Sequence, residues 1–121
     1  MTTQQVAERY YELAQQKKYP QIQDELYSAD IVNREPEHAA AMGIPTLTRG
    51  MEAVKAKGKA RAEMIEQIHG DYCGVPVVGG KFFSVAMGRD ITLKGKPRMQ
   101  VDEIAVFEVS NGKIVSEQFF Y

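Results

Sequence analysis

The sequence predicts an α+β fold in which helices pack against an antiparallel sheet. Apolar residues recur at three- and four-residue spacing near the start of the chain and again over 50–68, as amphipathic helices require. The last third instead alternates between apolar and polar residues and is divided by tight turns, which is typical of strands. Helices followed by a run of strands favour an α+β fold over a parallel, doubly wound one. A length of 121 residues fits one domain, expected to cover 1–121.

The first half of the chain predicts three helices and two short strands. Thr2 and Gln5 have the spacing of a capping box at the start of a helix over 3–18. Pro20 suits the first turn of a second helix that ends by 28–30. Short strands follow over 31–35 and 46–49, separated by a surface loop. A long helix is expected over 50–68, where Gly58 costs about 1 kcal/mol relative to alanine and suggests close approach to a sheet.

Four strands are expected in the second half, joined as a meander. They cover 75–78, 81–93, 99–109 and 113–121. Gly79-Gly80 and Asn111-Gly112 predict two of the hairpin turns, because these residues tolerate a positive φ. The residues alone therefore predict a sheet packed on helices.

Composition excludes several classes of function. Fifteen basic and sixteen acidic residues give a net charge of −1, which lacks the basic footprint of a nucleic-acid-binding protein. One cysteine, Cys73, and two separated histidines provide no metal-ligand spacing, so neither a metal nor another cofactor is expected. The polar start and the lack of a long apolar run predict a soluble, cytoplasmic protein without a membrane partner.

Two segments carry a family resemblance. Residues 9–10 with 26–32, and the closing strand–turn–strand segment 102–115 around Asn111-Gly112-Lys113, resemble SnoaL-like proteins of the nuclear transport factor two-like superfamily. The resemblance implies a cone: a strongly curved, mixed or antiparallel sheet wrapped on a long helix, with two N-terminal helices. It also implies a homodimer that pairs through the outer face of the sheet. The same cone hosts enzymes and non-catalytic proteins, so the resemblance alone does not assign an activity.

Ketosteroid isomerase, an enzyme with this cone, suggests three candidate catalytic residues. Tyr10 falls at the position of its first-helix tyrosine, and Glu35 before Pro36 at that of its base after one inserted residue. The third position is Ala105, which cannot donate a hydrogen bond, but Glu103 lies on the same face of the strand.

Each candidate also has a structural interpretation. Tyr10 could simply pack in the core, and Glu35 could end a strand at the surface. Glu103 is expected to point inward and Asp102 outward, and Glu103 could form a salt bridge with Arg89 instead of serving in a site.

The predicted pocket is apolar and sized for a small molecule. Its expected lining residues are Phe83, Val85, Met87, Arg89, Phe107 and His69. His69 is expected near the mouth, where it could carry a proton. Two functions remain open at this level. One is a homodimeric module that binds a small apolar ligand without catalysis. The other is a cofactor-independent acid–base enzyme, similar to ketosteroid isomerase or a polyketide cyclase, acting on a carbonyl compound.

Overall fold

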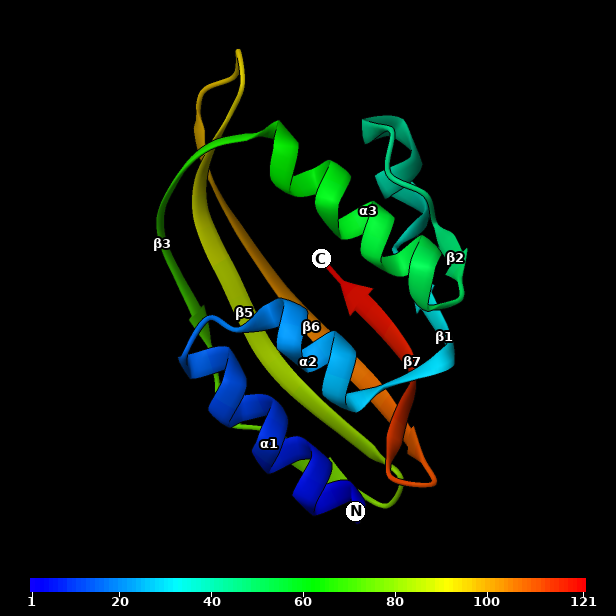
Figure 1. The fold of residues 1–121 in the computed structure, drawn as a ribbon. Helices are drawn as coiled ribbons and strands as arrows, with labels where there is room; N and C mark the ends of the chain where they lie inside the picture. Colours follow the sequence, from blue (N-terminus) through cyan, green and yellow to red (C-terminus); the bar gives the residue numbers. More distant parts are fainter.

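A computed structural model describes residues 1–121 and shows all three helices on one face of a curved sheet (Figure 1). The helices are α1 (Thr3–Gln15), α2 (Tyr19–Leu26) and α3 (Met51–Met64), with a 3-10 helix, η1 (Glu37–Met42). The strands are β1 (Tyr27–Arg34), β2 (Leu47–Arg49), β3 (Ile65–Cys73), β4 (Val77–Gly79), β5 (Phe82–Leu93), β6 (Arg98–Ser110) and β7 (Lys113–Phe120).

The sheet is mixed, curved and open. Its strand order is β2-β1-β7-β6-β5-β3, with β4 paired to β5. Neighbouring strands are antiparallel except β1 and β7, which run parallel and bring the two ends of the fold together. The predicted α+β class and the strongly bent sheet facing a helix are confirmed (Figure 1). The sequence analysis expected β7 only as the last strand of a meander and did not predict its parallel pairing with β1.

Helices α1 and α2 supply the main core. The capping box is present: the Thr2 N–H donates to Gln5 Oε1 at 2.9 Å and the Gln5 N–H donates to Thr2 Oγ1 at 3.2 Å. The buried side of α1 packs on the sheet, where the Tyr10 ring lies 4.8 Å from Phe107 and 5.7 Å from Phe83, centroid to centroid. The Phe83 and Phe107 rings stack at 4.7 Å. These rings form the aromatic part of the core between α1 and the sheet.

The predicted long helix is too long at its C-terminus. It ends at Met64, and the residues assigned to its last turn begin β3, a strand that the sequence analysis missed. Ile65 and Ile68 fit the helical spacing, yet they pair with Leu93 and Ile91 of β5. Pairing with residues 87–93 of β5 satisfies backbone groups that a longer helix would leave at the sheet edge. Tertiary pairing therefore overrides the local pattern.

Helix α3 packs much less tightly than its predicted apolar stripe suggests. Val54 is its only buried residue. A Cβ added at Gly58 would meet no atom within 4 Å, so the expected close approach to the sheet is wrong. Both observations mean that α3 stands away from the sheet and covers a space between them.

Two smaller boundaries also differ from expectation. Helix α2 ends at Leu26, and β1 begins directly at Tyr27 and not near 31. The expected loop after Pro36 contains η1, and its C-cap residue Gly43 has the left-handed φ of 76°. None of the helices in the chain combines the length and the hydropathy that a membrane span requires.

Candidate functional site

A cavity of about 690 Å³ lies between α3, the N-terminal helices and the inner face of the sheet. This volume is within the range of ligand pockets, about 300–1,000 Å³. Residues from α1, α2, α3, β1, β3, β5, β6 and β7 line it. The cavity thus lies in the space that the sparse packing of α3 leaves open.

Glu35 lies immediately after β1, and its carboxylate is buried in the cavity wall. The side chain is only 4% exposed. Lys57 Nζ lies 3.8 Å and Arg61 Nη1 3.7 Å from Oε1, and the Tyr121 hydroxyl donates to the same oxygen at 3.2 Å. Oε2 is buried with no hydrogen-bond partner. A buried carboxylate oxygen without a donor is costly, which makes Glu35 a candidate functional group.

Glu117, on β7, is a second buried carboxylate that the sequence analysis missed. Tyr27 Oη donates to Oε2, and Asn33 Nδ2 donates to Oε1 at 2.8 Å. Lys57 Nζ in turn donates to Asn33 Oδ1, which connects this network to Glu35. Burial raises the pKa of Glu117, although both hydrogen bonds oppose the shift. Side chains two residues apart on a strand lie on the same face, and Phe119 also lines the cavity. The spacing of Glu117 from Phe119 could therefore have indicated that Glu117 points inward.

Glu103 points into the cavity, as the strand alternation predicts. Burial, followed by the nearby charge of Glu35, raises the pKa of Glu103 to about 7. Its neighbour Asp102 is exposed on the other face, where it accepts a hydrogen bond of 2.7 Å from Tyr72 Oη. A carboxyl group with a pKa near neutrality can both hold and release a proton under ordinary conditions.

Tyr10 is both a core residue and part of the cavity wall. Its ring packs on Phe83 and Phe107, while the residue lines the cavity and its hydroxyl has no hydrogen-bond partner in the chain. Burial raises the pKa of Tyr10 well above its usual value, so this hydroxyl keeps its proton and can act as a donor. The two interpretations of Tyr10 are therefore compatible.

The predicted lining residues divide between the cavity and the core. Met87 and Arg89 line the cavity. Phe83, Val85 and Phe107 lie in the core beneath it, at most 2% exposed, because α1 packs directly on that part of the sheet.

His69 is also misplaced by the sequence analysis. Since 65–69 is strand and not helix, His69 lies on β3 and not at the cavity mouth. Its Nε2 lies 2.8 Å from Thr92 Oγ1 on the neighbouring strand β5.

The cavity is more strongly charged than predicted. Four carboxylates and five cations line its walls, together with aromatic and aliphatic side chains. These charged residues are Asp24, Glu35, Glu103, Glu117, Lys55, Lys57, Lys59, Arg61 and Arg89. Burial lowers the pKa of Lys57, and Glu35 opposes this shift. Burial raises the pKa of Tyr121 to about 12, with a further contribution from Glu35. Such a site can bind an apolar body and also handle charge or protons.

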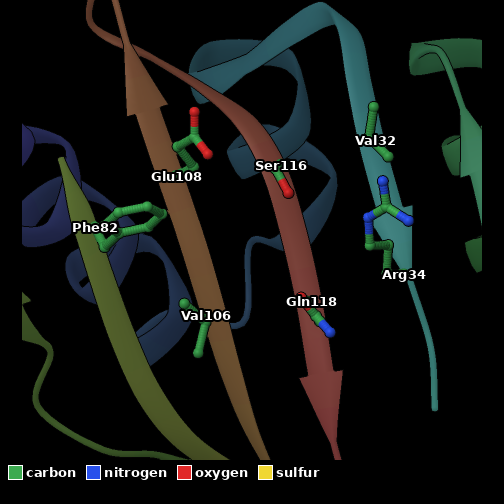
Figure 2. A pocket seen from close by; sticks show the side chains of 7 residues that line it. All are labelled: Val32, Arg34, Phe82, Val106, Glu108, Ser116 and Gln118. Carbon is green, nitrogen blue, oxygen red and sulfur yellow. The ribbon is translucent and has the colours of Figure 1, made fainter.

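The opposite face of the sheet carries a smaller hollow of about 360 Å³ (Figure 2). The labelled side chains come from β1, β5, β6 and β7, and the helices lie behind the sheet in this view. Apolar side chains on this face include Phe82, Ile104 and Phe120, which are 42%, 45% and 50% exposed. This face contains a mixed apolar and polar surface.

Comparison with known proteins decides the family. The model of the SnoaL-like domain matches residues 1–121. The chain belongs to the SnoaL-like family. A search of curated proteins gives no match.

Solved structures agree with this SnoaL-like assignment. A Mesorhizobium loti protein described as a candidate SnoaL-like polyketide cyclase is 29% identical, with 100% of both chains covered and a TM-score of 0.91. A Catenulispora acidiphila protein with a ketosteroid isomerase-like fold is 20% identical, covering 83% of this chain and 72% of that one, at a TM-score of 0.63. A cystatin-like protein of unknown function from Xanthomonas campestris is 17% identical, covering 99% and 90%, at 0.73. The SnoaL-like chain therefore shares its cone with these folds.

Proposed function

We propose that this SnoaL-like protein binds a small carbonyl compound with an apolar body and moves a proton on it without a cofactor. The observation that carries the proposal is the Oε2 atom of Glu35, which is buried and lacks a donor in a residue that lines the cavity. A purely structural carboxylate at this depth would be expected to satisfy both oxygens. The apolar lining supplies binding, and the charged end supplies the chemistry.

Glu35 is the proposed base. Its carboxylate takes a proton from the carbon next to the carbonyl group, and the electron pair of that C–H bond moves onto the carbonyl oxygen as an enolate. Lys57 and Arg61, at 3.8 and 3.7 Å, balance the charge of the carboxylate before the transfer. Return of the proton to the same or a neighbouring carbon completes an exchange or an isomerisation.

Tyr10 and Glu103 are the proposed donors to the developing oxyanion. Both line the same cavity as Glu35. The Tyr10 hydroxyl is free of other partners, and the pKa of Glu103, about 7, keeps a large protonated fraction near neutral pH. Hydrogen-bond donors fixed in a site of restricted water access stabilise an enolate more than water does.

Proton exchange on 2-tetralone tests this proposal without knowledge of the natural substrate. Its apolar bicyclic body fits the proposed class, and exchange of its α-protons in D₂O is followed by NMR. Glu35→Gln should slow the protein-catalysed exchange about 100-fold, the scale of a lost general base. Glu37→Gln removes an exposed carboxylate nearby and should leave the rate unchanged.

Equal exchange rates for Glu35→Gln and the unmodified protein would rule out this role for Glu35. If 2-tetralone bound while neither protein exchanged its protons above the buffer rate, the non-catalytic binding function would stand instead. The two outcomes are separated by measuring binding from chemical shifts of the protein in the same samples.

The same proposal includes a homodimer formed through the outer face of the sheet. Phe82, Ile104 and Phe120 give this face an exposed apolar surface, and Arg34 and Glu108 at the hollow provide opposite charges for a two-fold pairing. The partner would be a second copy of this chain.

A further inference from the structure

Arg89 is a partly buried cation of the cavity, and its surroundings differ from those of Lys57 and Arg61. Lys57 is held by Asn33 and Glu35, and Arg61 lies 3.7 Å from Glu35. Arg89 has no hydrogen bond and no ion pair in the chain, although it lines the cavity. The salt bridge to Glu103 that the sequence suggested does not form within 4.0 Å. The guanidinium group therefore keeps its donors free.

The surroundings of Arg89 hold it in place. Its guanidinium carbon lies 5.7 Å from the centroid of the Tyr19 ring, which is a cation–π contact. Inward neighbours along β5 are Met87 and Ile91, which also line the cavity. An arginine fixed on a strand and against a ring loses little freedom when it binds a planar anion through two parallel hydrogen bonds.

The charge of the cavity also favours an anion at Arg89. Burial raises the pKa of both Glu103 and Glu117, so these carboxyl groups become protonated at a higher pH than exposed ones. The lining has five cations and four carboxylates, and protonation of Glu103 or Glu117 increases this excess of positive charge. A ligand that brings its own carboxylate would restore the balance.

We infer that the ligand carries a carboxylate group and that Arg89 binds it at one wall of the cavity. This inference rests on the proposed function, because it identifies the substrate class of the same cavity as small organic acids with an apolar body. Arg89 determines specificity, whereas Glu35, Tyr10 and Glu103 act on the reacting carbon and oxygen.

A pair of ligands with the same shape tests the inference by binding alone. 2-Naphthoate and 2-naphthamide differ only in the charge and donors of one group, and protein NMR titration gives both dissociation constants. The unmodified protein should bind the acid at least about tenfold more tightly, the scale of a charge-assisted pair. Arg89→Gln should abolish this preference, and Arg89→Lys should retain part of it.

Arg49→Gln is the matched control. Arg49 is exposed on β2, does not line the cavity and has no ion pair, so its loss changes the net charge equally. The control should keep the full preference for the acid. Spectra of the free variants establish that each is folded before titration.

Two results would overturn the inference: equal affinity for acid and amide in the unmodified protein, or a full preference for the acid in Arg89→Gln. Either result together with normal 2-tetralone exchange would leave the proposed proton transfer standing. If the unmodified protein did not exchange the protons of 2-tetralone but still preferred the acid over the amide, the proposed proton transfer would be rejected. The acid-binding role of Arg89 would then stand.

Discussion

Single carboxyl groups control the chemistry available to this cavity, and each has a different environment. Glu35 has two cations and a tyrosine hydroxyl on one oxygen and nothing on the other. Glu117 has donors on both oxygens. Glu103 accepts no hydrogen bond from the chain, and burial raises its pKa to about 7. Different surroundings of like groups are how one site holds both a base and an acid.

Glu103 should make the stability of the protein depend on pH. Its pKa is raised in the folded state, so the folded protein binds the proton more tightly than the unfolded chain does. The resulting stabilisation is present below pH 4.5 and is lost as the pH rises through about 7. Glu103→Gln should therefore raise the free energy of unfolding relative to the unmodified protein at pH 9, on the order of 2 kcal/mol, and less at pH 5.

Urea unfolding at the two pH values measures this difference. Glu66→Gln is the control, because Glu66 is exposed on β3 and has no partner in the chain. A Glu103→Gln variant whose advantage is the same at pH 5 and pH 9 would contradict the assigned shift. Carboxyl-carbon NMR on the unmodified protein gives the pKa of Glu103 directly.

At the scale of elements, α3 covers the cavity, whereas α1 fills much of the core. It contributes one buried side chain, while α1 contributes five. Its charged residues Lys57 and Arg61 lie within 4 Å of the Glu35 carboxylate at one wall of the cavity. A helix that packed more closely would bury more apolar area but would fill the space where a ligand binds.

Two glycines should respond oppositely to alanine. A Cβ at Gly58 meets nothing within 4 Å, so Gly58→Ala should stabilise α3 by about 0.5–1 kcal/mol through its higher helix propensity. A Cβ at Gly88 would lie 2.6 Å from both Asp102 Oδ1 and the Tyr72 ring and 2.8 Å from the Val101 carbonyl oxygen. Gly88→Ala should therefore destabilise the protein by about 1–3 kcal/mol.

Chemical unfolding of the two variants measures both effects, and each serves as the reference for the other. Destabilisation by Gly58→Ala would mean that the added Cβ meets another atom within 4 Å and that α3 packs more closely than described. A neutral Gly88→Ala would mean that Tyr72 and β6 move aside easily.

At the scale of the whole molecule, the sheet has two faces with separate roles. The inner face carries the core and the cavity, and the outer face carries the exposed apolar side chains around Val106 (Figure 2). The same strands β5, β6 and β7 form both faces, so a change on the outer face need not alter the cavity. Dimer formation can therefore be tested separately from ligand binding.

Val106→Glu should convert the proposed homodimer into a monomer, because it places a charge in the middle of the outer face. Sedimentation velocity of the two proteins measures the change. Ala53→Glu adds the same charge at an exposed position of α3 and should leave the dimer intact. A monomeric unmodified protein at all concentrations would contradict the proposed pairing.

The local sequence pattern was sufficient for much of the fold. The capping box placed the start of α1, the glycine-containing turns placed the β4–β5 and β6–β7 hairpins, and strand alternation placed Glu103 inside and Asp102 outside. Each of these features depends on residues close together in the chain. The resemblance added the cone, which the matched family model and the curved sheet bear out.

Only the tertiary structure decided where α3 ends and which residues form the site. The spacing of Ile65 and Ile68 fits a helix, but their backbone groups pair with β5. Local spacing does not indicate this pairing, because β5 lies more than twenty residues further along the chain. The site combines residues from distant elements. Asn33 lies on β1 and Glu35 directly after it, whereas Lys57 lies on α3 and Glu117 on β7. Their proximity depends on the parallel pairing of β1 with β7. Sequence determines which side chains each element presents; the packing of distant elements determines which of them share one buried space.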